Sequence, residues 1–259
     1  MLRSLAFAVA FYVVTALFLL LGSWLLIAPR SWAMAGLRAH ARSACWLLKH
    51  IAGVAMEVRG REHLPAGPCL VVSKHQSAWE TFALIPLLTD PAIVLKDELK
   101  WIPVYGWFCV KFAHILVKRD KAAAALKAMI RASQNRIAAG RQVLIFPEGT
   151  RKAAGAPPDY KPGYVALYEA LQVPCVPVAL NSGLYWPRRT LMRHPGTIIV
   201  EFLPPFPAGI PRKAFRQAFE ERLEAACDRL IVEAVWTPQG PPLSPAILTR
   251  VFNSNEERT

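Results

Sequence analysis

The sequence lacks the features of several common protein classes. Charged side chains make up only 19% of its 259 residues and apolar residues make up 54%, which excludes a disordered chain. Its five cysteines are odd in number, scattered and without a Cys-x-x-Cys pair, which excludes a small disulfide scaffold. We therefore expect reduced thiols in a reducing compartment. Acidic residues are also scarce, with 18 Asp and Glu against 31 Lys and Arg, so the formal charge is +13.

The positive charge is not accompanied by other signs of nucleic-acid binding. A charge of +13 is compatible with contacts to a phosphate backbone. Yet the sequence contains no zinc-ligand spacing, no aromatic strand of the RNA-binding type and no recognition helix. Many basic residues instead lie near the apolar N-terminus and near the motifs described below. A membrane surface or a phosphorylated small molecule explains them more simply, and no nucleic-acid partner is predicted.

The N-terminal region contains a long apolar segment. Residues 5–29 carry no charged side chain, and as a helix they would extend about 37 Å, against a hydrocarbon core of about 30 Å. A cleaved signal peptide is the alternative, because Ala33-Met34-Ala35 resembles a cleavage site. The apolar core of a signal peptide is much shorter, about 7–15 residues. The sequence therefore predicts a retained membrane anchor.

Basic residues on both sides of this segment indicate its orientation. Arg3 precedes the segment and four basic residues follow it: Arg30, Arg38, Arg42 and Lys49. The positive-inside rule then predicts that the rest of the chain lies on the cytoplasmic face of the membrane. Residues 31–53 read as a second helix with one apolar face (Leu37, Ala44, Leu48, Ile51). This helix either lies in the lipid interface or covers the soluble domain. Because it is also lipophilic, a helical hairpin that enters the membrane from one face is an alternative to a spanning helix.

After residue 54, short β-rich runs alternate with helical segments, which predicts an α/β fold with a layered sheet flanked by helices. The expected strands are Val54–Val58, Cys69–Ser73, Ala92–Leu95, Ile115–Val117, Val143–Phe146, Val176–Leu180 and Thr197–Phe202. The expected helices are Ser77–Leu88, Val104–Lys111, Lys121–Ala139, Gly163–Leu171 and Arg212–Ala234, with Gly140 as a C-cap. We expect three parts: anchoring helices at 1–53, an α/β domain at 54–236 and a C-terminal tail at 237–259.

The first chemical motif follows the apolar strand at 69–73 and reads Lys74-His75-Gln76-Ser77-Ala78-Trp79-Glu80. Side chains at the carboxyl end of such a strand face a crevice in open α/β sheets. His75 can take a proton from a hydroxyl near neutral pH. Glu80 can orient the imidazole if His75 precedes the helix and Glu80 lies in its first turn. Ser77-x-x-Glu80 also fits a capping box, and the two roles are compatible.

Further polar residues follow other predicted strands. Phe146-Pro147-Glu148-Gly149-Thr150-Arg151 comes directly after the run at 143–145, and its Arg151 guanidinium suits phosphate oxygens. Lys96 and Arg119 follow the runs at 93–95 and 115–117. If the sheet brings these strand ends together, the three cations form a rim for a phosphorylated substrate; taken singly, each is an ordinary surface charge. Pro177 inside the strand at 176–180 indicates an edge strand or a special backbone position.

Together these motifs resemble the 1-acylglycerol-3-phosphate (lysophosphatidic acid) acyltransferase family of glycerolipid acyltransferases. The resemblance runs from about residue 54 to 205 and covers four blocks in the family's order: His75 to Glu80, Lys96–Leu99 through Gly106 to Arg119, Phe146–Arg151, and Val176–Val178. An FPEGTR block that follows a His-x4-acid block by about 70 residues is specific, whereas no single block would be.

The resemblance implies an acyltransferase fold with an N-terminal membrane anchor. It implies acyl transfer from acyl-CoA or acyl-carrier protein to the free hydroxyl of lysophosphatidic acid, which gives phosphatidic acid, with membrane lipids as surroundings and with no metal or other cofactor. It also implies roles for individual residues. His75 would be the general base, Glu80 its orienting partner, and Lys96, Arg119 and Arg151 ligands of the phosphate. Glu148, Gly149 and Thr150 would form the acceptor site, and Pro177 would belong to the acyl-donor side.

Three positions depart from the family's pattern. Glu80 stands where the family usually has Asp, Ala113 where it often has Gly, and Lys118 where an Asp often precedes the Arg. The last two leave the acceptor open, so another lysolipid, such as a lyso-ornithine lipid or a lysophospholipid, is the first alternative. A thioester or lipid hydrolase in which His75 activates water is a second alternative. A basic membrane-binding protein without enzymatic activity is the third.

Overall fold

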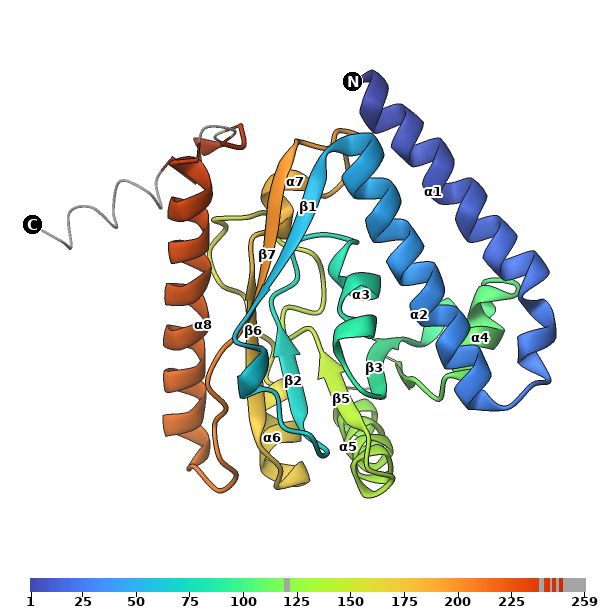
Figure 1. Ribbon diagram of the computed structural model, residues 1–259. Coiled ribbons are helices and arrows are strands. Elements are labelled where there is room, and N and C mark those ends of the chain that lie inside the picture. The colour runs from blue at the N-terminus through green and yellow to red at the C-terminus, as the bar shows by residue number, and fades with distance from the viewer. Residues whose placement is uncertain (119–121, 238–239, 243, 246, 249–259) are drawn as a thin grey trace, which may run out of the picture.

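The protein is built on one seven-stranded sheet with the strand order β1-β7-β6-β2-β5-β3-β4 (Figure 1). The computed structural model describes residues 1–118, 122–237, 240–242, 244–245 and 247–248. The strands are β1 (Val54–Arg59), β2 (Leu70–Ser73), β3 (Pro91–Lys96), β4 (Ile115–Val117), β5 (Gln142–Ile145), β6 (Cys175–Leu180) and β7 (Gly196–Phe202). Strands β6, β2, β5, β3 and β4 are parallel, whereas β7 is antiparallel to β6 and parallel to β1. All seven predicted strands and the layered α/β fold are confirmed.

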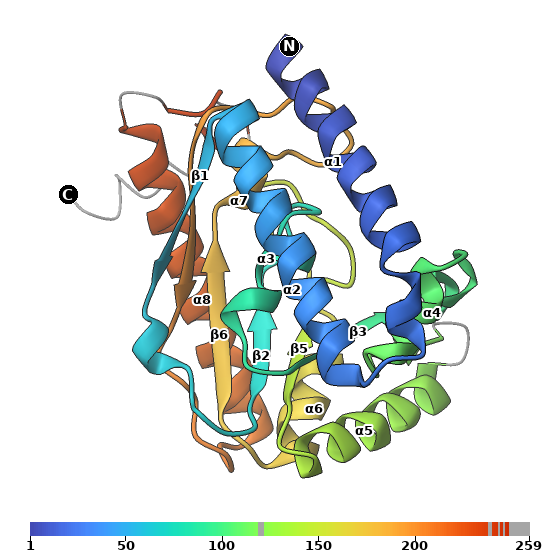
Figure 2. The ribbon, with the colours of Figure 1, turned by 45° about the vertical axis from the view of Figure 1, so that its right-hand side comes forward.

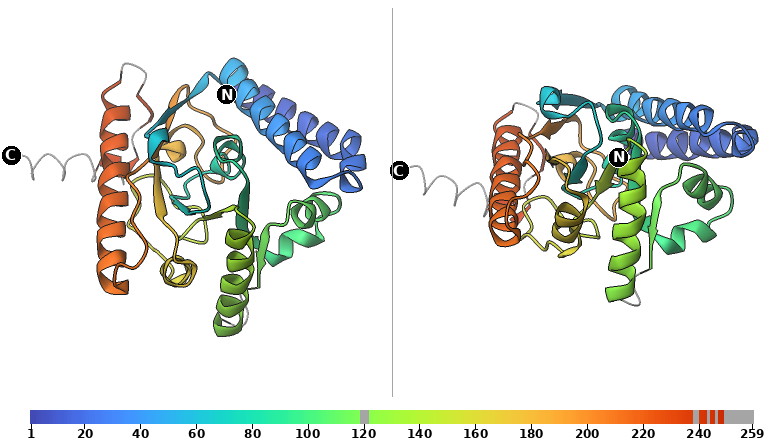
Figure 3. Two further views of the ribbon diagram at one scale, coloured as in Figure 1. Left: turned by 60° about the horizontal axis from the view of Figure 1, so that its bottom comes forward. Right: turned by 90° about the horizontal axis from the view of Figure 1, so that it is seen from below.

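Helices cover both faces of the sheet (Figure 3). They are α1 (Leu2–Leu21), α2 (Arg30–Leu47), α3 (Glu80–Ala83), α4 (Tyr105–Lys111), α5 (Ala122–Ala138), α6 (Gly163–Leu171), α7 (Ser182–Tyr185) and α8 (Arg212–Val235). Successive residues of a strand point to opposite faces. Thus Leu70 and Val72 of β2 pack with α5, α6 and α8, whereas Val71 packs with α1, α2 and α3. The central strands are apolar without alternation because both of their faces are buried.

The predicted helix at Ser77–Leu88 is wrong in its length. Only Glu80–Ala83 form the α-helix α3, and a 3₁₀ turn at Ile85–Leu87 follows. Pro86 has no amide N–H, so it cannot continue the α-helical hydrogen bonds. Residues 74–79 stay outside the helix because their backbone is bound by other groups, which are described below.

The N-terminal apolar segment is not one continuous helix. α1 ends at Leu21, a 3₁₀ turn η1 (Ser23–Leu26) reverses the chain, and α2 returns beside α1 (Figure 2). Gly22 and Pro29 bracket this turn. Within the described residues, α1 is the one helix that is long and apolar enough to cross a membrane. The N-terminal region is therefore a two-helix hairpin.

The hairpin is bound to the α/β domain through polar contacts as well as apolar ones. Arg30 donates two hydrogen bonds to Asp90, at 2.8 and 2.6 Å, and Arg38 donates to the carbonyl of Thr89. The apolar face predicted for residues 31–53 packs on the core, where Ala44 and Leu48 are buried. Since these basic residues have partners inside the protein, the predicted orientation toward the cytoplasm stays a prediction.

Pro177 lies in β6, which has neighbours on both sides, so the expectation of an edge strand is wrong. Regular pairing of β6 with β7 begins one residue later, at Val178 opposite Phe202. The missing amide of Pro177 therefore lies just outside the regular β6–β7 ladder. The chain that follows β7 there contains Pro204 and Pro205. This is the special backbone position that the sequence named as the other possibility.

Ala113, one of the departures from the family pattern, has a left-handed backbone with φ 54°. It closes α4 in a Schellman motif: the amide of His114 donates to the carbonyl of Cys109 and that of Ala113 to Val110. Gly140 ends α5 with φ 75° in the same way, which confirms the predicted cap. A glycine is favoured at this position because a Cβ clashes in the left-handed region.

The Ala113→Gly substitution is therefore expected to stabilise the protein. Relief of the left-handed strain should raise the free energy of unfolding by about 1 kcal/mol, measured by urea denaturation in detergent. The control is Ala128→Gly, on the exposed face in the middle of α5, which should lower the same free energy by a similar amount. A loss of stability in Ala113→Gly would contradict this account of the cap.

Candidate active site

The candidate active site lies at the carboxyl ends of β2, β5 and β6. β2 lies between the other two strands and is parallel to both. The segments that follow these strands, residues 74–80, 146–151 and 181–182, therefore meet at one edge of the sheet. The sheet thus brings the His-x4-acid block and the FPEGTR block to the same edge. The amide of Lys152, next to Arg151, donates to the carbonyl of His75 at 2.8 Å.

His75 and Glu80 form a hydrogen bond between Nδ1 and Oε1 at 2.9 Å. A carboxylate can only accept, so Nδ1 carries the proton and Nε2 keeps its lone pair. The imidazole stacks on the ring of Phe146 with a centroid distance of 4.4 Å, which fixes its plane. The side chain of His75 is 14% exposed while that of Glu80 is fully buried. Nε2 is thus a base on a partly exposed ring, and the buried carboxylate of Glu80 orients that ring through Nδ1.

The Glu80 carboxylate also holds the loop that carries His75. Its Oε1 accepts the amides of Gln76 at 2.7 Å and Ser77 at 2.6 Å, and its Oε2 accepts the hydroxyl of Ser182 at 2.9 Å. The bond from the Ser77 amide is the half of the capping box in which the acid reaches back. Capping and imidazole orientation therefore coexist on one carboxylate. Sequence reasoning missed Ser182, although its place directly after β6 satisfied the same strand-end rule.

Glu148 lies beneath the His75 backbone rather than in open space. It is 1% exposed. Its Oε2 accepts the amide of His75 at 2.8 Å, and its Oε1 lies 3.1 Å from the ammonium of Lys74. Burial raises the pKa of Glu148. Both carboxylate oxygens are thus used inside the protein, and Glu148 positions His75.

Lys74 is the centre of a buried polar cluster that sequence reasoning did not identify. Besides Glu148, its ammonium contacts Glu224 of α8 at 2.5 Å and the hydroxyl of Tyr160 at 3.1 Å. Tyr160 in turn donates to Glu224. Burial alone would lower the pKa of Lys74, but the charges of Glu148 and Glu224 outweigh it and raise that pKa. The cluster therefore links α8, on one face of the sheet, to the loop that carries the base.

Of the three cations of the predicted rim, the structure describes Lys96 and Arg151 but not Arg119. The side chains of half-buried Arg151 and of exposed Lys96, at the end of β3, make no hydrogen bond or ion pair with the part of the chain that the structure describes. β3 is the next strand after β5, one spacing of about 4.8 Å further along the sheet. Both side chains are therefore available to an anion at the same edge. Arg119 lies outside the described residues.

The remaining predicted site residues have structural places. Gly149 has φ 63°, which lets the FPEGTR segment turn sharply after β5, and Thr150 is exposed beside it. Pro177 is buried within β6. No group of three or more His, Cys, Asp or Glu side chains among the residues described could hold a metal ion.

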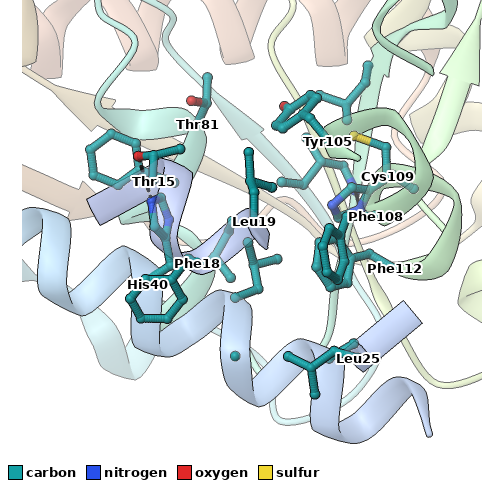
Figure 4. A pocket seen from close by; sticks show the side chains of 18 of the residues that line it. Thr15, Phe18, Leu19, Leu25, His40, Thr81, Tyr105, Phe108, Cys109 and Phe112 are labelled. Carbon is teal, nitrogen blue, oxygen red and sulfur yellow. Dashed lines mark hydrogen bonds between the residues drawn. The ribbon is translucent and has the colours of Figure 1, made fainter. Parts of the chain in front are cut away.

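An apolar cavity of about 260 Å³ opens beside the site (Figure 4). The hairpin α1–α2 forms one wall and α4 forms another, with Phe108 and Phe112 facing the cavity. Ala78, from the block that carries His75 and Glu80, and Thr81, the residue after that block, line it as well. The apolar cavity therefore reaches the segment that follows His75 in the chain.

Comparison with known proteins agrees with this geometry. Residues 55–181 match the model of the acyltransferase family. The chain is 40% identical over 159 residues to a 1-acyl-sn-glycerol-3-phosphate acyltransferase of Pseudomonas aeruginosa, which covers 61% of this chain and 62% of that relative. It is 32% identical over 161 residues to the alpha form of that acyltransferase from Mus musculus, over 61% and 56% of the two chains. The match thus spans less than two thirds of these curated relatives' length.

A solved structure shows the same fold. The crystal structure of the 1-acyl-sn-glycerophosphate acyltransferase PlsC from Thermotoga maritima superposes with a TM-score of 0.70 at 20% sequence identity. The superposition covers 86% of this chain and 97% of that one. The likeness supports the overall fold of the chain.

The Lys74 cluster predicts a charge-dependent stability change. Lys74→Met removes the cation that buried Glu148 and partly buried Glu224 share, and should lower the free energy of unfolding by about 3–5 kcal/mol. In Lys74→Met/Glu148→Gln one of these carboxylates is removed, so part of the loss should be recovered. Chemical denaturation measures both variants.

Lys213→Met, at an exposed position of α8, is the control for loss of a lysine and should be close to wild type. A Lys74→Met protein as stable as this control, or a double variant less stable than Lys74→Met, would show that the cluster does not hold the loop.

Proposed function

Because the chain belongs to the acyltransferase family, we propose that it transfers a fatty acyl group from acyl-CoA or acyl-carrier protein to the free hydroxyl of 1-acylglycerol 3-phosphate, giving phosphatidic acid. The observation that carries the proposal is the hydrogen bond of 2.9 Å between His75 Nδ1 and Glu80 Oε1. It leaves Nε2 as an accessible base, and an apolar cavity and two cations without a side-chain partner among the described residues lie around the same strand ends. The curated relatives named above act, by their names, on 1-acyl-sn-glycerol 3-phosphate.

In the proposed reaction His75 Nε2 removes the proton of the acceptor hydroxyl while the hydroxyl oxygen attacks the thioester carbonyl carbon. Glu80 stabilises the imidazolium that forms at this step. The carbon–sulfur bond then breaks, the acyl group remains on the acceptor oxygen, and the departing thiolate takes the proton from Nε2. The thioester is already activated, so no covalent enzyme intermediate is required.

Charge and shape support the choice of substrates. The Arg151 guanidinium can bind phosphate oxygens in a bidentate manner, and Lys96 adds a second cation on the neighbouring strand end. The proposed contribution of Arg119 stays a prediction. The cavity beside Ala78 and Thr81 has the apolar walls that an acyl chain requires. The long apolar helix α1 supports a membrane location, with the catalytic domain proposed to lie on the cytoplasmic face.

Substitution of the base and of its partner tests the chemistry. His75→Ala and Glu80→Gln should each lower kcat by about 10²–10⁴-fold, because the first removes the base and the second removes the charge that stabilises the imidazolium. The assay uses purified protein, labelled acyl-CoA and a panel of lysolipid acceptors. His50→Ala, at an exposed position, is the control and should retain activity.

The same assay without acceptor separates the alternatives. A hydrolase would release free fatty acid at the full rate when no lysolipid is present. A membrane-binding protein without activity would show no turnover for any acceptor, and the His75→Ala substitution would change nothing.

Replacement of Arg151 tests the phosphate site. Arg151→Ala removes charge-assisted hydrogen bonds and should raise KM for lysophosphatidic acid about 10–100-fold. The KM for acyl-CoA should change much less. Arg216→Ala, on the exposed side of α8, serves as the control. An unchanged KM for lysophosphatidic acid would mean that the acceptor phosphate lies elsewhere or that the natural acceptor lacks one.

A further inference from the structure

A second exposed apolar surface lies outside the N-terminal hairpin. It consists of Trp101, Ile102, Trp107 and Val110, which are 76%, 46%, 58% and 61% exposed, and we call it the α4 patch. It spans the 3₁₀ turn η5 (Asp97–Trp101) and α4. Trp107 and Val110 are three residues apart and share one face of α4. Folded soluble proteins seldom leave such a cluster of large apolar side chains in water.

The opposite face of α4 is apolar as well. Phe108 and Phe112 are buried there against Ala33 and Met34 of α2, and Leu25 of η1 packs against the same cluster. α4 is thus apolar on both sides. Helices that are apolar all round occur inside protein cores or in lipid, and the inner face of α4 already has its protein partners. The outer face is the one that lacks a covering element within the described residues.

The patch is held in a fixed position. A Cβ at Gly106 would lie 2.1 Å from the carbonyl oxygen of Lys100, so only glycine allows this close approach of η5 and α4. Val104 just before α4 has φ 62°, a strained value that a β-branched residue keeps only where the surroundings impose it. The tryptophans are therefore presented by a rigid turn.

The α4 patch lies near other exposed apolar side chains, on α1 and the turn that follows it. Exposed apolar side chains follow α1 and η1 toward α4: Tyr12, Leu17, Leu20, Leu21, Trp24 and Ile27. α4 lies beside the turn of the hairpin in several views (Figures 1, 2 and 3). Hairpin and patch thus share one side of the molecule, away from α8.

The charges around the patch indicate what covers it. The ammonium of Lys100 lies 5.0 Å from the centre of the Trp101 ring and 2.7 Å from Asp97. Lys111 ends α4, and Lys96 precedes η5. Tryptophan rings next to lysines are typical of the boundary between acyl chains and headgroups, where anionic lipids attract the cations.

We propose that the α4 patch inserts into the same anionic leaflet as α1, as a second membrane contact. The cavity beside the active site lies between α1–α2 and α4, so both of its walls would touch lipid. A lysolipid and its acyl chain would then pass between leaflet and site without crossing water. This inference gives the proposed function a route for its lipid substrate, but lipid contact is measurable without turnover.

Fluorescence quenching tests the contact directly. The full chain is reconstituted in vesicles of phosphatidylethanolamine and phosphatidylglycerol, with or without brominated acyl chains. The emission that Trp107→Phe removes belongs to Trp107, and brominated chains should quench it at least about twofold, because they reach only rings at the acyl boundary. Trp236, 72% exposed at the end of α8, is the matched control, and its share of the emission should be unchanged.

A second variant tests the consequence for binding. Trp107→Ser/Val110→Ser should weaken binding to the same vesicles about tenfold, through the loss of buried apolar area. In detergent micelles its turnover should stay near the wild-type value, whereas Trp236→Ser should change neither property. The proposal is overturned if brominated chains quench the emission of Trp107 no more than that of Trp236, or if the serine variant binds vesicles as tightly as the wild type. A patch that instead joins two copies would leave Trp107 unquenched, and the serine variant would convert a dimer to a monomer in detergent.

Discussion

The candidate active site depends on one buried carboxylate. Glu80 accepts hydrogen bonds from the His75 ring, from the amides of Gln76 and Ser77, and from the hydroxyl of Ser182. These donors come from the loop after β2 and from the start of α7, so a single side chain joins the ends of two neighbouring strands. A carboxylate with several fixed donors is rigid, and rigidity is what a general base needs to meet its substrate in one geometry.

A second set of charged side chains, Glu148, Lys74 and Glu224, supports the loop that carries His75. Glu148 holds the His75 backbone, and Lys74 neutralises Glu148 together with Glu224. Burying three charges in this way costs desolvation energy, which the mutual attraction offsets only while all partners are present. The site is therefore coupled to α8 on the far face of the sheet.

The proposed membrane contacts and the proposed chemistry meet at the apolar cavity. The same elements that expose large apolar side chains, α1 and α4, line the cavity on the inside. This arrangement gives a reason for the close packing of α4, a short helix with strained flanking residues, against the hairpin. In the proposed function, this packing allows a lipid acceptor to reach His75 from the leaflet, and Arg151 and Lys96 bind the acceptor phosphate at the polar edge of the site.

Much of the molecule was determined by the sequence alone. The apolar runs fixed all seven strands because buried parallel strands leave a continuous signal, and the position of His75 and Arg151 after strands placed both at one edge. Local sequence patterns could not reveal the contacts Lys74–Glu224 and Glu80–Ser182, or the buried position of Glu148. Each of these depends on which strands are neighbours in the sheet. The predicted helix at Ser77–Leu88 was too long. The local capping signal does not show that Glu80 binds the amides of the preceding loop, which therefore stays outside the helix. The hairpin and the α4 patch were likewise decided by tertiary packing, because hydropathy measures apolar length but not whether the chain turns back or which face remains uncovered.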